Sequence, residues 1–289
     1  MHLVTYILAR VLIAPLRLVP FWLLYLSSDA FAFLLYHLGY RKRVVMDNLN
    51  RCFPEKTAAE RRAIAKASYR NLADITFETL KSLACPVSSV LARFDTPDAG
   101  LINRYFEEGR SVLLVGGHYN NWEWAALTMG IGLKGHSIIV YKTLTNAYMD
   151  RWLAASRARG ENTLLCPMNE TFATVKSKQN ERYMMILGAD QSPSNRRTSH
   201  WIDFFGQKTA CLPGPDVIGR QFDCPIVYFE IQRVARGRYV MRYHPLVEKP
   251  TETTSPEITQ AFMARLEQTI RQTPENWLWS HRRWKMNPD

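Results

Sequence analysis

The first 38 residues of the chain are almost wholly apolar. The stretch is interrupted at Arg10, Pro15, Arg17, Pro20 and Asp29. Because proline breaks the interior of a helix, the pattern predicts two segments, roughly 3–19 and 21–38, rather than one straight rod. Residues 18–36 carry a single formal charge and approach the length that a helix needs to cross the hydrocarbon core of a membrane.

The residues that flank this apolar stretch indicate whether it is a signal peptide or a membrane attachment. No small-residue cleavage site of the A-x-A kind closes it, so we do not interpret it as a removable signal peptide. Arg41, Lys42 and Arg43 follow at once, as expected at the cytoplasmic boundary of a membrane. We therefore expect residues 1–40 to attach the protein to a membrane, either spanning it or lying in its interface. The alternative is a buried core helix with an amphipathic neighbour.

Residues 41–289 show no repeat, low-complexity tract or Ser/Gly linker, so we expect one domain there. Residues 57–83 carry apolar positions at helical spacing. They begin on Thr57 with Glu60 three residues later, the pattern of a capping box.

After this helix the apolar positions change to short continuous runs, which predict buried strands. The runs are 111–118, 136–141, 162–166 and 183–190, and the helical stretches between them are 121–131, 146–159 and 169–178. Such alternation predicts a mostly parallel sheet covered on both faces. Residues 225–232 and 238–246 follow as an antiparallel pair, and 256–272 as an amphipathic helix. The expected fold class is α/β, with a mostly parallel central sheet flanked by helices and an N-terminal hydrophobic helical anchor.

The net charge indicates the class of binding partner, and the cysteine content bears on disulfides and metal sites. The net charge of +11 and the isoelectric point near 9.5 predict an anionic partner, such as a nucleic acid, lipid head groups or an acidic protein. No nucleic-acid-binding module is recognisable, and the apolar N-terminus makes a lipid surface the better interpretation. The five cysteines are scattered and form no CxxC pair, which argues against a disulfide framework and a zinc site.

Candidate chemistry lies where two predicted strands end. In open α/β sheets, reactive groups gather on the loops at the carboxyl ends of the strands. One strand leads into GGHYNNWE with His118 at the turn, and another leads into GADQSP with Asp190. His118 and Glu123 are five positions apart, which on a regular helix is about 140° of rotation, so they would not share a face. They can meet if His118 precedes the helix and Glu123 lies in its first turns.

A carboxylate at one imidazole nitrogen fixes the tautomer and leaves the other nitrogen to take a proton from a hydroxyl. There is no HExxH motif for a metal and no GxSxG elbow for a protein nucleophile. The pattern therefore favours direct activation of a substrate hydroxyl, with a capped helix start and a hydrogen-bonded histidine as the structural alternative. The GxGxxG match at 130–135 follows a helix and leads into a strand, so we interpret it as a helix end and turn rather than a dinucleotide site.

The run GRSVLLVGGHYNNWE resembles the H-x4-D/E block of the bacterial lipid A acyltransferases, the lauroyl and myristoyl transferases that add secondary acyl chains. Further blocks follow the order of that family over nearly the whole chain: YRKRVVMDNLNRCFPEK, GADQSP, FFGQKTACLPGP and WLWSHRRWK. The resemblance implies transfer of a fatty acyl group from acyl carrier protein or coenzyme A to a hydroxyl of a lipid A precursor. It implies no metal or bound cofactor, no nucleic acid, and a location at the bacterial inner membrane with the active site facing the cytoplasm.

The resemblance also implies roles for four residues. His118 would be the general base and Glu123 its orienting partner. Arg157 would stabilise the oxyanion of the tetrahedral intermediate or grip a phosphate, unless it is an exposed cation on the polar face of its helix. Asp190 would position Arg157 or an acceptor hydroxyl.

Further residues are candidates for substrate binding. They are Asn121, Arg159, Arg196, Arg197, Phe205, Arg282 and Arg283. Phe205, in the FFG block, would line the acyl or acceptor channel, or it forms part of a buried aromatic pair. The cations of the QSPSNRRTSH segment would bind an acceptor phosphate, or they belong to a solvated basic loop. Those of the WSHRRWK segment would contact a phosphorylated lipid head group or an acidic carrier protein, or they lie at a helix terminus and complement its dipole.

Two features depart from the family pattern, and they leave the acceptor open. Tyr119 and Asn120 stand where many members have Phe-Gly, and the loop after Asp190 is unusually basic. The rival acceptors are a lysophospholipid, an aminoacyl lipid and a mannosylated phosphoinositide. A non-catalytic lipid-binding membrane scaffold is the rival from another functional class.

Overall fold

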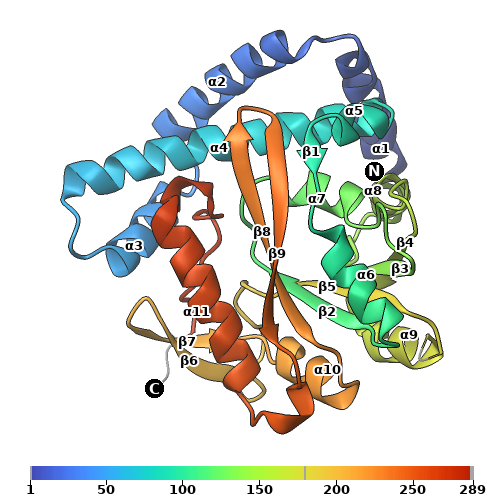
Figure 1. Ribbon diagram of the computed structural model, residues 1–289. Helices are drawn as coiled ribbons and strands as arrows, with labels where there is room; N and C mark the ends of the chain where they lie inside the picture. Colours follow the sequence, from blue (N-terminus) through green and yellow to red (C-terminus); the bar gives the residue numbers. More distant parts are fainter. Residues whose placement is uncertain (1, 179, 287–289) are drawn as a thin grey trace.

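The computed structural model describes residues 2–178 and 180–286, and a seven-stranded sheet lies at its centre (Figure 1). The strand order is β1-β9-β8-β2-β5-β3-β4. All neighbours are parallel except β8 and β9, which form an antiparallel hairpin. The strands are β1 (Phe94–Asp95), β2 (Val112–Gly116), β3 (His136–Tyr141), β4 (Thr163–Pro167), β5 (Tyr183–Gly188), β8 (Ile226–Ala235) and β9 (Arg238–Val247).

Helices cover both faces of the sheet, which confirms the predicted mostly parallel α/β fold. Successive residues of β2 alternate between the two cores, as the period of a strand requires. Leu113 and Val115 pack in a core with helix α11, and Val112 and Leu114 pack in a core with helices α6 and α7. The helices after β1 are α6 (Ala99–Glu107), α7 (Trp122–Thr128), α8 (Ala147–Arg157), α9 (Thr171–Ser177), α10 (Gly214–Gln221) and α11 (Glu257–Gln272), with short 3-10 turns η2 (Met168–Glu170), η3 (Pro250–Glu252) and η4 (Pro274–Asn276).

The sequence located most of these elements, although several end earlier than predicted. The helix expected over 121–131 stops at Thr128, and the chain turns through Gly130 and Gly132 before β3. Gly132 has a φ of 70°, a conformation that most side chains disfavour. The GxGxxG match is therefore a helix end and turn, as predicted. The FFG block instead forms a hairpin that the sequence analysis did not anticipate. Its strands are β6 (His200–Phe204) and β7 (Gln207–Cys211), joined through Phe205 and Gly206, which both have positive φ.

Most of the helices that precede β1 pack around α4 (Ala58–Ala84), the long helix that crosses Figure 1. Its predicted capping box is present: the Thr57 hydroxyl accepts from the Glu60 amide, and the Glu60 carboxylate accepts from the Thr57 amide. Helix α2 packs along α4. The remaining helices before β1 are α1 (His2–Ile13), η1 (Ala14–Arg17), α2 (Phe21–His37), α3 (Lys42–Cys52) and α5 (Ser88–Leu91).

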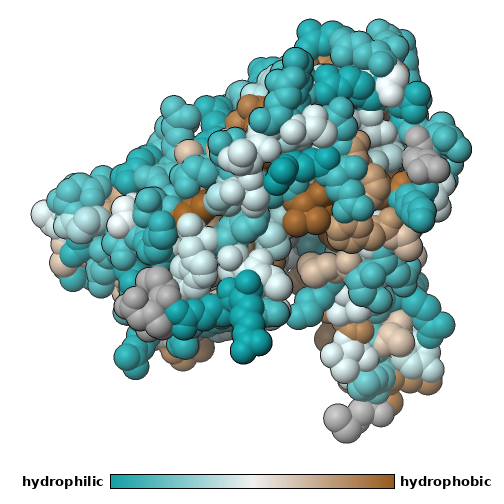
Figure 2. Space-filling model, turned by 90° about the horizontal axis from the view of Figure 1, so that it is seen from below, coloured by the Kyte–Doolittle hydropathy of each residue, from teal (hydrophilic) through white to brown (hydrophobic). Residues whose placement is uncertain are grey.

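The predicted break between two apolar N-terminal segments is present between α1 and α2, at η1. Neither helix is long and apolar enough by itself to cross a membrane, and the same holds for every other described helix. Helices α2 and α3 meet that criterion together by length and composition, but they are bent by 84°. Large apolar side chains of α1 and α2 nevertheless face outward, among them Val11, Leu12, Trp22 and Phe33. By contrast, most of the face shown in Figure 2 is hydrophilic.

Candidate active site

The candidate site begins where β2 ends, at Gly116 and Gly117. Neither glycine has a positive φ, so the backbone conformation is not what requires glycine here. A Cβ on Gly116 would lie 2.3 Å from the ring of Phe229, and one on Gly117 would lie 2.8 Å from the Leu266 side chain. The glycines therefore allow the close packing that holds the following residue, His118, at the edge of the sheet.

The imidazole of His118 is bound by Asp190. Its Nδ1 lies 2.6 Å from Oδ1 of Asp190, and the His118 backbone amide donates to Oδ2 at 2.9 Å. The indole of Trp277 donates to the same Oδ2 at 2.9 Å. An ionised carboxylate only accepts hydrogen bonds, so Nδ1 carries the proton, and in the neutral ring Nε2 is left as the base. The Gln191 amide nitrogen lies 3.3 Å from Nε2.

Strand pairing explains why these two residues meet. Strands β2 and β5 are parallel neighbours with Gly116 opposite Gly188. His118 and Asp190 each lie two residues beyond those glycines, and both therefore leave the sheet at the same carboxyl edge.

Burial and neighbouring charges shift the pKa values of both His118 and Asp190. Burial raises the pKa of Asp190, but the adjacent His118 and three hydrogen-bond donors outweigh it and lower that pKa to about 2. Burial of His118 disfavours its charged form, yet the carboxylate of Asp190, with a smaller contribution from Glu123, raises its pKa above the ordinary 6.5. The imidazolium is thus stabilised where it would form.

Glu123 pairs with Arg157 instead of His118. The Arg157 guanidinium donates from Nη2 to Oε1 at 2.8 Å and from Nε to Oε2 at 3.0 Å, the two-pronged geometry that arginine makes with carboxylates. Within the described part of the chain, His118 and Glu123 share no hydrogen bond. The contact positions expected for Glu123 and Asp190 are therefore exchanged, because the neighbouring strand β5 brings Asp190 within hydrogen-bonding distance of Nδ1 of His118.

His118, Glu123 and Arg157 line one cavity of about 270 Å³. Its polar lining includes Lys142 and Gln191, and its apolar lining includes the side chains of Met129, Ile139, Ile186 and Phe229. A base, a cation and an apolar wall in one cavity suit a substrate that combines a polar reacting group with a hydrocarbon chain.

The family model for bacterial lipid A biosynthesis acyltransferases matches residues 1–286. The chain belongs to this family. It is accordingly an acyltransferase that forms esters on hydroxyl groups, and membership of the family supports acyl transfer to lipid A.

Curated relatives cover most of the length of this acyltransferase. The lipid A biosynthesis palmitoleoyltransferase of Escherichia coli (strain K12) is 26% identical over 255 residues, which are 87% of this chain and 81% of the relative. The lauroyltransferase of the same organism is 26% identical over 256 residues, 86% of this chain and 80% of the relative. A lipid A biosynthesis acyltransferase of Haemophilus influenzae is 23% identical over 281 residues, 93% of this chain and 86% of the relative.

Two of the predicted substrate-binding residues of this acyltransferase hold helices in place. Asn121 is fully buried: its Oδ1 accepts from the amide of Trp124 and caps α7, while its Nδ2 donates to Glu78. Arg159 donates to the backbone oxygens of Ser82 and Cys85 at the end of α4, which docks α8 against that helix. Neither side chain lines the cavity of His118.

Phe205 and Arg283 are buried in the core rather than placed in that cavity. Phe205 stacks edge-on against Phe204, which corresponds to the buried aromatic pair that was the alternative to a channel lining. Arg283 is 1% exposed and donates to the backbone oxygen of Ala210 on β7. Phe205 lies in the turn of the hairpin of β6 and β7, and Arg283 binds the hairpin at β7, so both side chains stabilise the fold at positions where the family motif lies.

The other predicted cations, Arg196, Arg197 and Arg282, are exposed. The guanidinium of Arg196 lies 5.7 Å from the ring centre of Trp201. None of the three lines the cavity that contains His118.

Three site residues received no separate role from the sequence. Trp277 supports Asp190, Gln191 lies against Nε2 of His118, and Lys142 adds a cation to the cavity. Gln191 lies in the GADQSP block and Trp277 in the WLWSHRRWK block, and the resemblance of these blocks to the family was the available signal. Lys142 follows β3 at the same carboxyl edge of the sheet, so strand position alone indicates it.

Proposed function

We propose that this protein transfers a fatty acyl group from an acyl thioester, carried by acyl carrier protein or coenzyme A, to a hydroxyl of a lipid A precursor. The observation that carries the proposal is the position of His118. Its Nδ1 is held by Asp190, and its ring borders a cavity with an apolar wall.

In the proposed reaction, Nε2 of His118 takes the proton of the acceptor hydroxyl. The hydroxyl oxygen attacks the thioester carbonyl, and a tetrahedral intermediate forms. As it collapses, the C–S bond breaks and the imidazolium returns its proton to the leaving thiolate. Asp190 stabilises the imidazolium in between, as a carboxylate does in other histidine-based acyl transfers.

Arg157 and Lys142 supply positive charge to the same cavity. Glu123 holds Nε and Nη2 of Arg157, while Nη1 makes no hydrogen bond within the described residues. A guanidinium fixed in this way would stabilise the oxyanion of the intermediate or bind a phosphate of the donor or acceptor. This role preserves the expected use of Arg157 and gives Glu123 the task of orienting it.

We further propose that residues 1–40 attach the enzyme to the bacterial inner membrane and that residues 41–289 form the acyltransferase domain on the cytoplasmic side. The outward-facing apolar side chains of α1 and α2 support this proposal. Arg41, Lys42 and Arg43 lie shortly after the end of α2 at His37, as basic residues do at a cytoplasmic membrane boundary.

The pH dependence of the reaction tests the role of His118 as a base. A base must be neutral to accept a proton, so activity falls as the pH drops through its pKa. Because the carboxylates of Asp190 and Glu123 raise the pKa of His118, the acidic limb of kcat/KM should have its midpoint above pH 6.5. Rates measured from pH 5 to 9 with one thioester donor would locate it. A midpoint well below 6.5 would contradict the assignment.

The acceptor is tested by mass spectrometry of lipids from cells with and without the gene. We expect loss of one acyl chain from lipid A in the deletion strain and its return with the wild-type gene. A change confined to phospholipids, with the acyl number of lipid A unchanged, would instead identify a lysophospholipid acceptor.

A further inference from the structure

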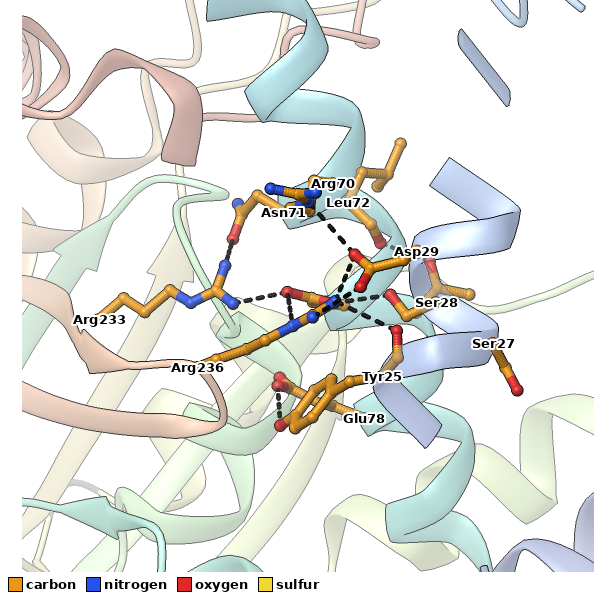
Figure 3. Close-up of polar contacts among 12 residues, drawn as sticks. Tyr25, Ser27, Ser28, Asp29, Arg70, Asn71, Leu72, Glu78, Arg233 and Arg236 are labelled. Atoms are coloured by element: carbon orange, nitrogen blue, oxygen red, sulfur yellow. Dashed lines mark hydrogen bonds and ion pairs between the residues drawn. The ribbon is translucent and has the colours of Figure 1, made fainter. Parts of the chain in front are cut away.

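A buried polar cluster joins α2, α4, the end of β8 and the turn between β8 and β9 (Figure 3). Its members Asp29, Asp74 and Arg236 do not line the cavity of His118. At the centre of the cluster Asp74 of α4, which is 0% exposed, accepts hydrogen bonds from Arg233, Arg236 and Ser28. Arg236 also pairs with Asp29 of α2 at 2.9 Å. The cluster fixes the inner, polar face of α2 onto the acyltransferase domain, while the apolar side chains of α2 face outward.

Glu78 lies one helical turn further along α4 and extends this cluster. Its carboxylate is 0% exposed and accepts from the hydroxyls of Tyr25 and Tyr239, each at 2.8 Å, and from Nδ2 of Asn121 at 2.7 Å. Its backbone oxygen accepts from the indole of Trp124 at 3.2 Å. Figure 3 shows the contact between Glu78 and Tyr25. Three donors converge on this group, so a carboxylate, which offers several acceptor sites and no donor, fits the position.

The contact with Asn121 leads from this cluster to the candidate active site. Asn121 lies between His118 and Glu123 in the chain, and its Oδ1 caps α7. The first turn of α7 carries Glu123, which holds Arg157 in the cavity. Arg159, two residues after Arg157, is bound to the end of the same α4 helix. Both members of the Glu123–Arg157 pair are thus placed relative to α4.

We propose that Glu78 is a positioning residue that ties the start of α7, and with it Glu123, to α4 and to the N-terminal helix α2. This inference rests on the proposed function of the His118 cavity. Tyr25 of α2 donates a hydrogen bond to Glu78, and Asn121 at the start of α7 donates another. The position of α2 is thereby linked to the turn that carries His118 and Glu123.

Three substitutions at Asn121 and Glu78, with a fourth as a control, separate this positioning role from a general effect on the fold. Asn121→Ser keeps an oxygen that can cap α7 but is too short to reach Glu78. Glu78→Leu removes the acceptor altogether. Glu78→Gln is the conservative variant, because its amide oxygen can accept from Asn121 and Tyr239 while its NH2 group donates to the Tyr25 hydroxyl. Tyr105→Phe is the matched control, since it removes another tyrosine–glutamate hydrogen bond, to Glu248, and neither of these residues lines the cavity.

We expect Asn121→Ser and Glu78→Leu to lower kcat by about ten- to a hundredfold with little change in KM, because small displacements of reacting groups are costly. The acidic limb of kcat/KM should also move to lower pH. His118 keeps Asp190, Gln191 and Trp122 beside it, but displacement of the start of α7 moves the Glu123 carboxylate, which raises the pKa of His118, away from the ring. For Glu78→Gln and Tyr105→Phe, kcat should stay within about threefold of the wild-type value, and the acidic limb of kcat/KM should keep its midpoint.

The measurements use the full chain in detergent with an acyl thioester donor, and His118→Ala is assayed in parallel with thermal unfolding of every variant. If Asn121→Ser and Glu78→Leu lower only the melting temperature and leave kcat and the acidic limb unchanged, Glu78 is merely structural and the proposal is overturned. If His118→Ala is inactive in that same experiment, the proposed function stands and the positioning role alone falls. Full activity of His118→Ala would overturn the proposed function, and the positioning role with it.

Discussion

Replacing His118 with alanine is expected to abolish acyl transfer and leave the fold intact. General base catalysis contributes on the order of 10²- to 10⁴-fold, so kcat should fall by about that factor. Asp190 would keep two of its donors, the backbone amide at position 118 and the indole of Trp277, and its buried charge would remain hydrogen-bonded. Steady-state rates and the thermal unfolding midpoint would be measured on the same preparation.

His136→Ala is a suitable control for this variant. His136 is a second histidine at the start of β3, where it pairs with Glu181 and does not line the cavity of His118. Its replacement should leave the rate unchanged. If His118→Ala complemented a deletion strain as well as the wild type does, the protein would act as a lipid-binding scaffold rather than through the chemistry proposed for this cavity.

Asp190→Asn is expected to have the second-largest effect, a loss of about 10²- to 10⁴-fold in kcat, because an orienting carboxylate fixes the tautomer of the base. Asp190 accepts at both oxygens, from Nδ1 of His118 on one and from a backbone amide and Trp277 on the other. An asparagine amide has one acceptor and one donor end. With its oxygen toward the backbone amide and the indole, its NH2 group faces Nδ1 of His118 and favours the tautomer in which Nε2 carries the proton and cannot act as the base. The loss of negative charge should also move the acidic limb of kcat/KM to lower pH.

Glu123→Gln provides the comparison that decides which carboxylate orients the base. Glu123 contacts Arg157 and influences His118 only through space. Its replacement should therefore cost less than Asp190→Asn, about 10- to 100-fold in kcat, through a less firmly held guanidinium. If Glu123→Gln were the more damaging of the two, the dyad of His118 and Glu123 inferred from the sequence would be the better description.

The pattern of the sequence determined a large part of this protein. Continuous apolar runs predicted the parallel strands, and the capping box predicted the start of α4. The rule that reactive groups gather at the carboxyl ends of strands placed His118 and Asp190 at one edge of the sheet. The motif blocks, in their order, predicted the family, which the match over residues 1–286 confirmed. All of these signals are local or depend on order along the chain.

The partners of the site residues were decided by the tertiary structure. The family motif and nearness along the chain pointed to Glu123 as the partner of His118. Neither reveals that β2 and β5, far apart in sequence, are neighbours with Gly116 opposite Gly188. The same reasoning could not distinguish a cation in a cavity, such as Arg157, from one buried in the core, such as Arg283. Residue type and spacing predict which groups are able to react or bind. The order of strands in the sheet and the packing of helices on it decide which of those groups meet, because hydrogen bonds and ion pairs form over a few ångströms of space, whatever the separation along the chain.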